Sequence, residues 1–482
     1  MLQRIKIHGL GSGGEGVGKL DGITVFVEGA LPGEEVLAEI ETVKKNYAVA
    51  RLIEVVKPSA ERVEPFCPLY KNCGGCQLQH MSYPAQLIWK RQQVVDAIER
   101  IGKLEVVRSY TAAKSTPNSK LQTPNCNSGV EIFETLGMEN PLRYRNKMQF
   151  PVGKSKAELI IGCYARGSHK IIDAQSCPIQ NIGNDKILAA VKKVAAQFNL
   201  QPYDEDTHKG FLRHVMGRVG CDGELMVVLV TATKNFPNEK NFVRALRREL
   251  PEVTSIQQNV QTYHNNVILG RDTRILYGKP TIHDKIGKLK FNISARSFFQ
   301  VNTAQAEVLY KTALDFAELE GGEIVVDAYC GTGTIGLFFA KKAHRVYGVE
   351  VVSSAIADAK KNARENNIRN VEFFVGDAVK ILPRLVDADV HADVVVVDPP
   401  RAGCDKKVLE TFAAMEADKI IYVSCNPATL ARDLAILKSL GYVTTKIQPV
   451  DMFPFTSHVE CVAQLKSSRL LRPRKDAVSV RS

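Results

Sequence analysis

Four cysteines have the spacing of a metal site. Cys67, Cys73 and Cys76 follow the pattern C-x5-C-x2-C, and Cys177, within Ser-Cys-Pro, is the candidate fourth ligand. Four thiolates suit either zinc or an iron–sulfur cluster. Because the spacing is unequal and no second C-x2-C pair is present, the pattern favours the cluster. Spacing alone does not distinguish the two metals.

Polar residues follow five predicted strands in the last part of the chain. In an open parallel sheet the ligand binds beyond the carboxyl ends of the strands. Acids can also mark where strands meet solvent. That explanation accounts for any one of Glu350, Asp377 and Asp398, but it accounts poorly for all three together. We therefore expect a site at this edge. The predicted strands are 324–328, 345–349, 371–375, 393–397 and 420–424, and the residues at their ends are Tyr329, Glu350, Asp377, Asp398 and Cys425.

A glycine loop follows the first of these strands. Gly331, Gly333 and Gly336 match G-x-G-x-x-G, and Glu350 lies about 20 residues further on, where an acid can bind ribose hydroxyls. That pattern alone fits NAD equally well. Asp377 can accept a hydrogen bond from an adenine amino group, and the Asp-Pro-Pro and Ser-Cys-Asn-Pro segments have no evident role in hydride transfer. S-adenosylmethionine is therefore the better ligand.

Cys425 is a candidate nucleophile. A thiol at a strand end, close to a helix that begins near Pro427, is expected to have a stabilised thiolate. A lone cysteine is more often a small core residue. Glu460, two residues after His458, could act as a general base. On the residues alone, a surface acid on an edge strand is the preferred interpretation of Glu460.

Composition and charge limit the class of protein. The chain has 482 residues, 45% of them hydrophobic and 24% charged, which is typical of folded globular domains. We find no apolar run long enough for a membrane span and no signal peptide, so we expect a cytoplasmic protein. Its 11 cysteines then favour metal binding or catalysis over disulfides. The net charge of +12 fits a nucleic-acid partner or solubility alone about equally well.

The pattern of apolar runs predicts three domains and a tail. Residues 1–59, with apolar runs at 23–27, 35–40 and 48–56, indicate a small antiparallel β-barrel, either an RNA-binding module or an ordinary β domain. Residues 60–285 indicate a central α+β domain that holds the cysteines. Residues 286–466 alternate strands and helices, which predicts an α/β, doubly wound, mostly parallel Rossmann-like sheet. A polar insertion at 115–129 and a basic tail at 467–482 complete the chain.

Together these residues resemble the RNA 5-methyluridine methyltransferase family, in its form with an amino-terminal TRAM domain and an iron–sulfur centre. The likeness spans nearly the whole chain, and its combination of motifs is highly specific. The polar insertion at 115–129 departs from it. The motifs that carry the likeness are the four cysteines, Arg143-Tyr144-Arg145-Asn146-Lys147, Ser297-Phe298-Phe299-Gln300-Val301-Asn302, residues 327–333, Asp398-Pro399-Pro400-Arg401, Ser424-Cys425-Asn426-Pro427 and His458-Val459-Glu460.

The resemblance implies a role for each site residue. Cys425 is the nucleophile, Glu460 the base, and Cys67, Cys73, Cys76 and Cys177 hold a [4Fe–4S] cluster. The implied substrates are S-adenosylmethionine and RNA, with 23S ribosomal RNA favoured over transfer RNA, and we expect no obligate protein partner. Phe298 or Phe299 could stack on the target base, or both could be core aromatics. The cofactor and target-base site is implied to be lined by Gln300, Tyr329, Glu350, Asp377 and Asp398.

Three other functions compete with this one. A radical methylthiotransferase can carry a TRAM domain, but its cluster needs C-x3-C-x2-C, and the interval from Cys67 to Cys73 is too wide. A transfer RNA 5-methyluridine methyltransferase would share the motifs. A non-catalytic RNA-binding or assembly protein would have no use for Cys425.

Overall fold

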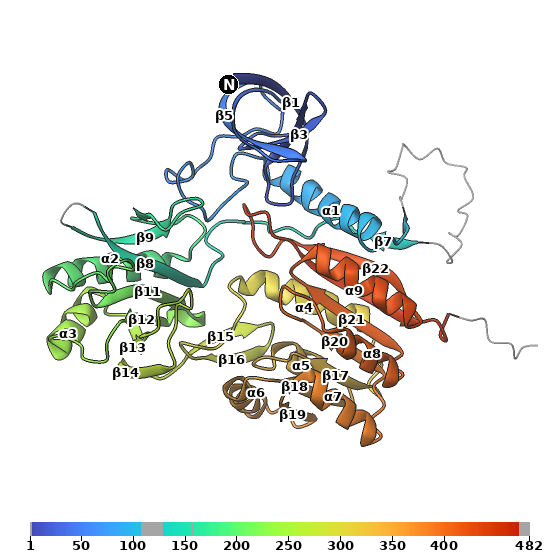
Figure 1. Ribbon diagram of the computed structural model, residues 1–482. Coiled ribbons are helices and arrows are strands. Elements are labelled where there is room, and N and C mark those ends of the chain that lie inside the picture. Colours follow the sequence, from blue (N-terminus) through green and yellow to red (C-terminus); the bar gives the residue numbers. More distant parts are fainter. Residues whose placement is uncertain (1, 108–128, 156–157, 472–482) are drawn as a thin grey trace, which may run out of the picture. The chain divides into compact units, whose positions relative to one another are not determined.

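The computed structural model describes residues 2–107, 129–155 and 158–471 (Figure 1). Most of the insertion predicted at 115–129 and of the basic tail therefore lies outside the described residues. Contacts divide the chain into two compact units. The first comprises 1–86, 137–306 and 453–457, and the second comprises 87–136, 307–452 and 458–482.

The first unit begins with the predicted barrel, drawn in dark blue in Figure 1. Its five strands close in the order β1-β2-β3-β5-β4, with β3 and β5 parallel. Ile5, Val25, Val27 and Val36 fill the interior. The apolar runs predicted as strands correspond to β3, β4 and β5. The strands are β1 (Leu2–Leu10), β2 (Gly16–Leu20), β3 (Ile23–Glu28), β4 (Glu35–Val43) and β5 (Tyr47–Lys57).

A seven-stranded sheet forms the rest of the first unit, in the order β10-β9-β8-β11-β12-β13-β14. The helices α2 (Ile182–Gln197) and α3 (Glu239–Glu249) pack on one face through residues such as Val191 and Leu246. A hairpin of β15 (Ile282–Ile286) and β16 (Leu289–Ile293) follows. The sheet strands are β8 (Lys147–Ser155), β9 (Glu158–Tyr164), β10 (Ile171–Asp173), β11 (Leu212–Val219), β12 (Leu225–Thr231), β13 (Val253–Val260) and β14 (Asp272–Gly278).

The second unit contains a nine-stranded sheet in the order β19-β18-β17-β20-β21-β23-β22-β7-β6. The five predicted strands are confirmed as neighbouring parallel strands, and β23 pairs antiparallel with both β21 and β22. β7 pairs parallel with both β22 and β6. The strands are β17 (Ile324–Ala328), β18 (Arg345–Glu350), β19 (Val371–Val375), β20 (Val394–Val397), β21 (Lys419–Ser424), β22 (Tyr442–Val450), β23 (Glu460–Ser467), β6 (Val106–Val107) and β7 (Val130–Ile132).

One face of this sheet is covered by four helices that share a continuous core with it, and this core includes Ile98, Leu382, Phe412 and Leu434. These helices are α1 (Tyr83–Arg100), α7 (Ala378–Asp387), α8 (Lys406–Ala414) and α9 (Pro427–Ser439). The other helices of the unit are α4 (Thr303–Ala317), α5 (Thr334–Phe339) and α6 (Ser353–Glu365). Within the described ranges, no helix combines the length and the apolar character that crossing a membrane requires.

A buried ion pair joins α1 to the end of β22. The Lys90 ammonium lies 2.5 Å from Asp451 Oδ1, and neither side chain is exposed to solvent. Removing one partner of such a pair leaves an uncompensated charge in the core, whereas replacing both partners by apolar groups is often tolerated.

We therefore predict that Lys90→Met lowers the free energy of unfolding by about 3–5 kcal/mol. The double variant Lys90→Met/Asp451→Leu should recover most of that loss. Urea unfolding of both variants measures the difference. Equal losses in the single and double variants would contradict this account of the pair.

Candidate active site

The parallel strands of the second unit bring the predicted residues to one edge of the sheet. Strands β17, β18, β19, β20 and β21 are neighbours in register, so their carboxyl ends lie together. The residues at or just beyond these ends are Tyr329, Glu350, Asp377, Asp398 and Cys425.

The loop after β17 has a tightly folded backbone. Gly331 and Gly333 have φ angles of 54° and 80°, the left-handed region that glycine enters without steric cost. Tyr329 has a φ of 64°, which a bulky residue adopts only when the surrounding structure enforces it. A Cβ at Gly336 would lie 2.8 Å from Asp327 Oδ2, so that position also requires glycine. At Gly331 an added Cβ would meet nothing within 4 Å, so the loop leaves space for a ligand to approach the backbone there.

Two acids flank this loop. Glu350 accepts hydrogen bonds from the backbone N–H of Gly331 at 3.2 Å and of Val352 at 2.8 Å, which fixes its carboxylate beside the glycines. Asp377 caps α7 by accepting from the N–H of Val379 at 3.0 Å and is exposed. Both carboxylates are held in place by the backbone, and each has a further lone pair for a polar ligand.

Strand register sets Cys425 beside Glu460. Ser424 of β21 lies opposite Cys461 of β23. Cys425 and Glu460 are the next residues on the two strands beyond this pair, and Asp398 follows the neighbouring strand β20. A thiol and two carboxyl groups thus meet at the edge of the sheet.

Burial raises the pKa of all three groups, and neighbouring acids raise the pKa of Glu460 and Cys425 further. Burial, then the charge of Asp398, raises the pKa of Glu460 to about 8, and burial raises the pKa of Asp398 to about 7. Burial, followed by the charges of Glu460 and Asp398, raises the pKa of the Cys425 thiol to about 11. At neutral pH the thiol and Glu460 are mainly protonated.

The prediction of a stabilised Cys425 thiolate is therefore wrong for the protein without ligands. Helix α9 does begin at Pro427, and Asn426 caps it by accepting from the N–H of Ala428 at 3.0 Å. The favourable field of the helix terminus is outweighed by burial and by the two neighbouring acids.

Arg401 is a site residue to which the sequence analysis assigned no role. Its positive charge lowers the pKa of both Cys425 and Glu460, against the effect of burial. Asp433 holds the loop that follows Arg401. It accepts hydrogen bonds from the Cys404 N–H at 2.8 Å and from the Tyr422 hydroxyl at 2.6 Å. The motif Asp-Pro-Pro-Arg carried the signal, because its arginine lies only three residues after the acid at the strand end.

Gln300 belongs to the first unit, where its backbone carbonyl accepts from Asn146 Nδ2 at 2.9 Å.

The structure separates the two neighbouring aromatics. Phe299 is 2% exposed and packs against Phe291, whereas Phe298 is 67% exposed. Phe299 is thus a core residue, and Phe298 lies at the surface.

The four predicted metal ligands gather in the first unit. Burial and then the thiols of Cys177, Cys73 and Cys67 raise the pKa of Cys76 to about 12, so all four lie within electrostatic reach of one another. Cys163 was not predicted, yet its side chain hydrogen-bonds to Cys73. Among residues that the structure describes, no three His, Cys, Asp or Glu side chains are arranged to hold a single metal ion.

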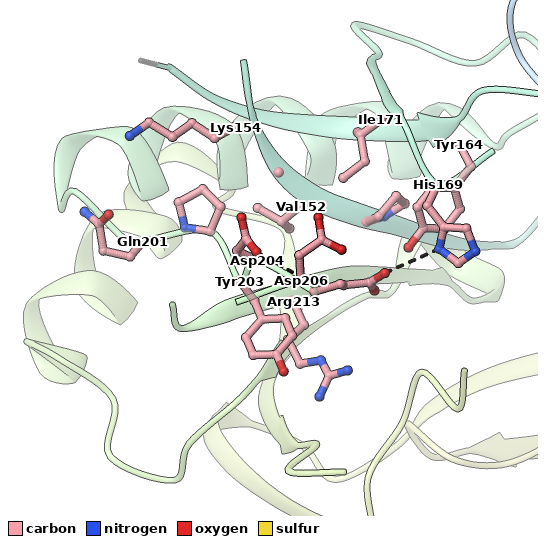
Figure 2. A pocket seen from close by; sticks show the side chains of 14 residues that line it. Val152, Lys154, Tyr164, His169, Ile171, Gln201, Tyr203, Asp204, Asp206 and Arg213 are labelled. Carbon is pink, nitrogen blue, oxygen red and sulfur yellow. Dashed lines mark hydrogen bonds and ion pairs between the residues drawn. The ribbon is translucent and has the colours of Figure 1, made fainter. Parts of the chain in front are cut away.

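A cavity of about 540 Å³ also lies in the first unit, between β8, β9 and residues 201–206 (Figure 2). His169 pairs with Glu205 at 3.4 Å on its wall, and Arg213 lies over the Tyr203 ring at 4.4 Å. None of its lining residues is a predicted site residue.

Family models match two parts of the chain. The TRAM domain matches residues 2–53, the closed barrel, and the tRNA (uracil-5-)-methyltransferase model matches residues 222–468. An uncharacterized RNA methyltransferase of Clostridium tetani is 51% identical, with 95% of this chain and 94% of the relative covered. A similar protein of Halalkalibacterium halodurans is 49% identical, with 96% of each covered. The chain belongs to the RNA (uracil-5-)-methyltransferase family.

A solved structure has the same fold over almost the whole chain. It is the Pyrococcus abyssi tRNA (uracil-54, C5)-methyltransferase in complex with S-adenosyl-L-homocysteine. The two chains are 29% identical and align with a TM-score of 0.74, covering 96% of this chain and 99% of the archaeal one.

We predict that Asp398→Asn increases the reactivity of Cys425, because it removes a negative charge that raises the pKa of the thiol. At a fixed pH well below that pKa, the fraction of Cys425 present as thiolate rises about tenfold for each unit by which the pKa falls. Mass spectrometry of iodoacetamide alkylation at Cys425, followed from neutral to alkaline pH, measures the change. Asp389→Asn, at an exposed acid of the same unit, is the control. The same alkylation profile in both variants would contradict the electrostatic coupling.

Proposed function

We propose that this protein transfers the methyl group of S-adenosylmethionine to carbon 5 of a uridine in RNA. The observation that carries the proposal is the meeting of a thiol, Cys425, with the carboxyl groups of Glu460 and Asp398 at the edge where the glycine loop also lies. Methylation of an unreactive ring carbon requires both a nucleophile and a base, and these residues supply them.

The glycine loop, Glu350 and Asp377 are the proposed binding site for S-adenosylmethionine. Glu350 would bind the ribose hydroxyls and Asp377 the adenine amino group, with Tyr329 and Asp398 toward the methyl group and the base. Gln300 is included in the proposed site on the family resemblance alone. The S-adenosyl-L-homocysteine in the archaeal structure supports this choice of ligand. When bound, the sulfonium supplies an electrophilic methyl group.

Cys425 would act first. Its thiol would lose its proton to water and the sulfur would bond to carbon 6 of uracil, so that the electron pair of the ring double bond moves to form an enolate. Carbon 5 of that enolate would take the methyl group, and the electron pair of the broken sulfur–carbon bond would stay with the departing S-adenosyl-L-homocysteine. Arg401 favours this step, because its charge stabilises the thiolate. The target base must leave its stack to reach the sulfur.

Glu460 would act second, as the base that removes the proton from carbon 5. The double bond then re-forms and the sulfur leaves carbon 6. Only the ionised carboxylate can accept this proton, and the Glu460 pKa of about 8 makes it a stronger base than an ordinary glutamate.

The RNA substrate that we propose is 23S ribosomal RNA, on the basis of the family resemblance. Transfer RNA is the second candidate, because the archaeal structure with the same fold is named as a tRNA (uracil-54, C5)-methyltransferase. Mapping 5-methyluridine in ribosomal and transfer RNA from cells with and without this protein distinguishes them.

The cysteines suit a [4Fe–4S] cluster held by Cys67, Cys73, Cys76 and Cys177. Their thiols lie in electrostatic reach of one another, and a cluster requires sulfurs spread around a larger volume than a single ion does. Methyl transfer needs no redox step, so the cluster would be structural. Cys76 packs with Phe455, which lies five residues before Glu460 in the chain. The Phe455 carbonyl accepts hydrogen bonds from the N–H groups of Gln77 and Leu78.

We predict that protein purified without oxygen contains iron and absorbs visible light, and that Cys76→Ser removes both, because it removes a cluster ligand. Cys221→Ser, at a cysteine outside this group, is the matched control and should keep the iron. Metal analysis measures the iron and zinc content of the protein and both variants. Stoichiometric zinc in place of iron would refute the cluster.

We predict that Glu460→Gln stalls the reaction after methyl transfer, because Cys425 can still add but the proton cannot leave. Loss of a general base commonly costs about 100-fold or more in rate. A protein–RNA complex labelled by a radioactive methyl donor should then survive denaturing electrophoresis.

Two variants complete this experiment. Glu410→Gln, at an exposed glutamate of the same unit, should turn over normally, and Cys425→Ala should give neither product nor complex. Normal turnover by Cys425→Ala would exclude the covalent mechanism. A trapped complex without label, or normal turnover by Glu460→Gln, would exclude Glu460 as the base. A non-catalytic RNA-binding protein would give no methylated RNA with any variant.

A further inference from the structure

Three cations lie together on the seven-stranded sheet of the first unit. Lys147 at the start of β8 is directly opposite Arg218 of β11 in the antiparallel ladder. Arg145 precedes Lys147 by two residues, so alternation along the extended chain puts both on the same side. The charged groups that act on the Lys147 ammonium are Arg218 and Arg145. Within the described residues no carboxylate is ion-paired with any of the three.

This arrangement costs stability in the absence of a ligand. Like charges directly opposite each other on neighbouring strands repel. Arg218 is 4% exposed, and its buried Nε has no hydrogen-bond partner among the described residues. Burial, then the charges of Arg218 and Arg145, lowers the pKa of Lys147 to about 8, and burial lowers the pKa of Arg218 to about 10. An anion bound here would relieve both the repulsion and the burial of unpaired charge.

The cations also hold the segment that carries Phe298. Arg218 Nη2 donates to the carbonyl of Ser297 at 2.5 Å. Asn146, between Arg145 and Lys147, donates from Nδ2 to the Gln300 carbonyl at 2.9 Å. The backbone on both sides of the exposed Phe298 is thus held, by Arg218 before it and by Asn146 after it. Cations for phosphates and an exposed ring for a base are the two groups that bind single-stranded RNA.

We propose that Lys147, supported by Arg145 and Arg218, binds a backbone phosphate of the substrate RNA next to the base that Phe298 contacts, an assignment that rests on the proposed methylation of RNA. A phosphate fits this group of cations, because its oxygens can accept from several donors at once. The excess of 64 Lys plus Arg over 52 Asp plus Glu agrees with a polyanionic partner. Lys147 is the residue to test, because Arg218 also supports the backbone.

The test measures binding of a labelled single-stranded oligouridylate by fluorescence anisotropy over a range of KCl concentrations. One lost phosphate contact should reduce the slope of log affinity against log salt by about one. We expect that reduction for Lys147→Gln and little change for Lys147→Arg. Lys234→Gln, which removes the same charge from an exposed site of the same unit, should leave the slope within error of the unmodified protein.

Thermal unfolding separates this role from a structural one. Removing Lys147 relieves repulsion by Arg218, so Lys147→Gln should melt at the same temperature or higher although it binds RNA more weakly. The proposal would be overturned if the salt slope of Lys147→Gln were unchanged or changed only as much as that of Lys234→Gln. A lower melting temperature without a change of slope would also overturn it.

The two proposals fail in different ways. Because the assay measures binding alone, an intact methylation activity with an unchanged slope rejects only the phosphate site. A reduced slope in a protein that never methylates RNA rejects only the proposed reaction.

Discussion

The antiparallel pairing of β23 with β21 is the constraint on which the site depends. The pair Ser424 and Cys461 ends the ladder, and the next residue on each strand is Cys425 or Glu460. A shift of the register by one residue would turn Glu460 to the opposite face of the sheet. The parallel strands alone would deliver Cys425 and Asp398 but not the carboxyl group of Glu460. The fold thus places a buried acid beside a thiol, at the cost of electrostatic repulsion between them.

The raised pKa of the Cys425 thiol, which burial and then the neighbouring acids produce, has a consequence for the resting protein. A thiol with a raised pKa reacts slowly with electrophiles and oxidants, because the thiolate is the reactive form. Cys425 is therefore protected while no substrate occupies the site. In our proposal the thiolate develops only when the uracil ring is present to accept its electrons, so reactivity is linked to binding of the substrate.

The sequence was sufficient to locate the site but not to describe its electrostatics. The positions of Tyr329, Glu350, Asp377, Asp398 and Cys425 followed from strand ends, because parallel strands share an edge. The direction of the Cys425 pKa shift could not be predicted, since it depends on burial and on Asp398, which no spacing reveals.

Cross-strand neighbours were also hidden from the sequence. Lys147 and Arg218 are far apart in the chain and meet only through the register of β8 and β11. Cys163 lay outside the C-x5-C-x2-C pattern and joins it through an isolated bridge between Cys73 and Ala165. Likewise, Phe298 and Phe299 are adjacent in sequence, and only their burial separates a core ring from an exposed one.

The division of the chain into interleaved units affects its synthesis. The first unit needs residues 453–457, whose Phe455 carbonyl accepts from the N–H groups of Gln77 and Leu78. At about 5–20 residues per second, a ribosome makes that segment on the order of tens of seconds after the cysteine segment has emerged. During that interval Cys76 and the apolar side chains around it have no Phe455 to cover them. The first unit therefore completes its folding only after residues 453–457 have been translated. Until then its apolar surface is exposed, and chaperones can bind it.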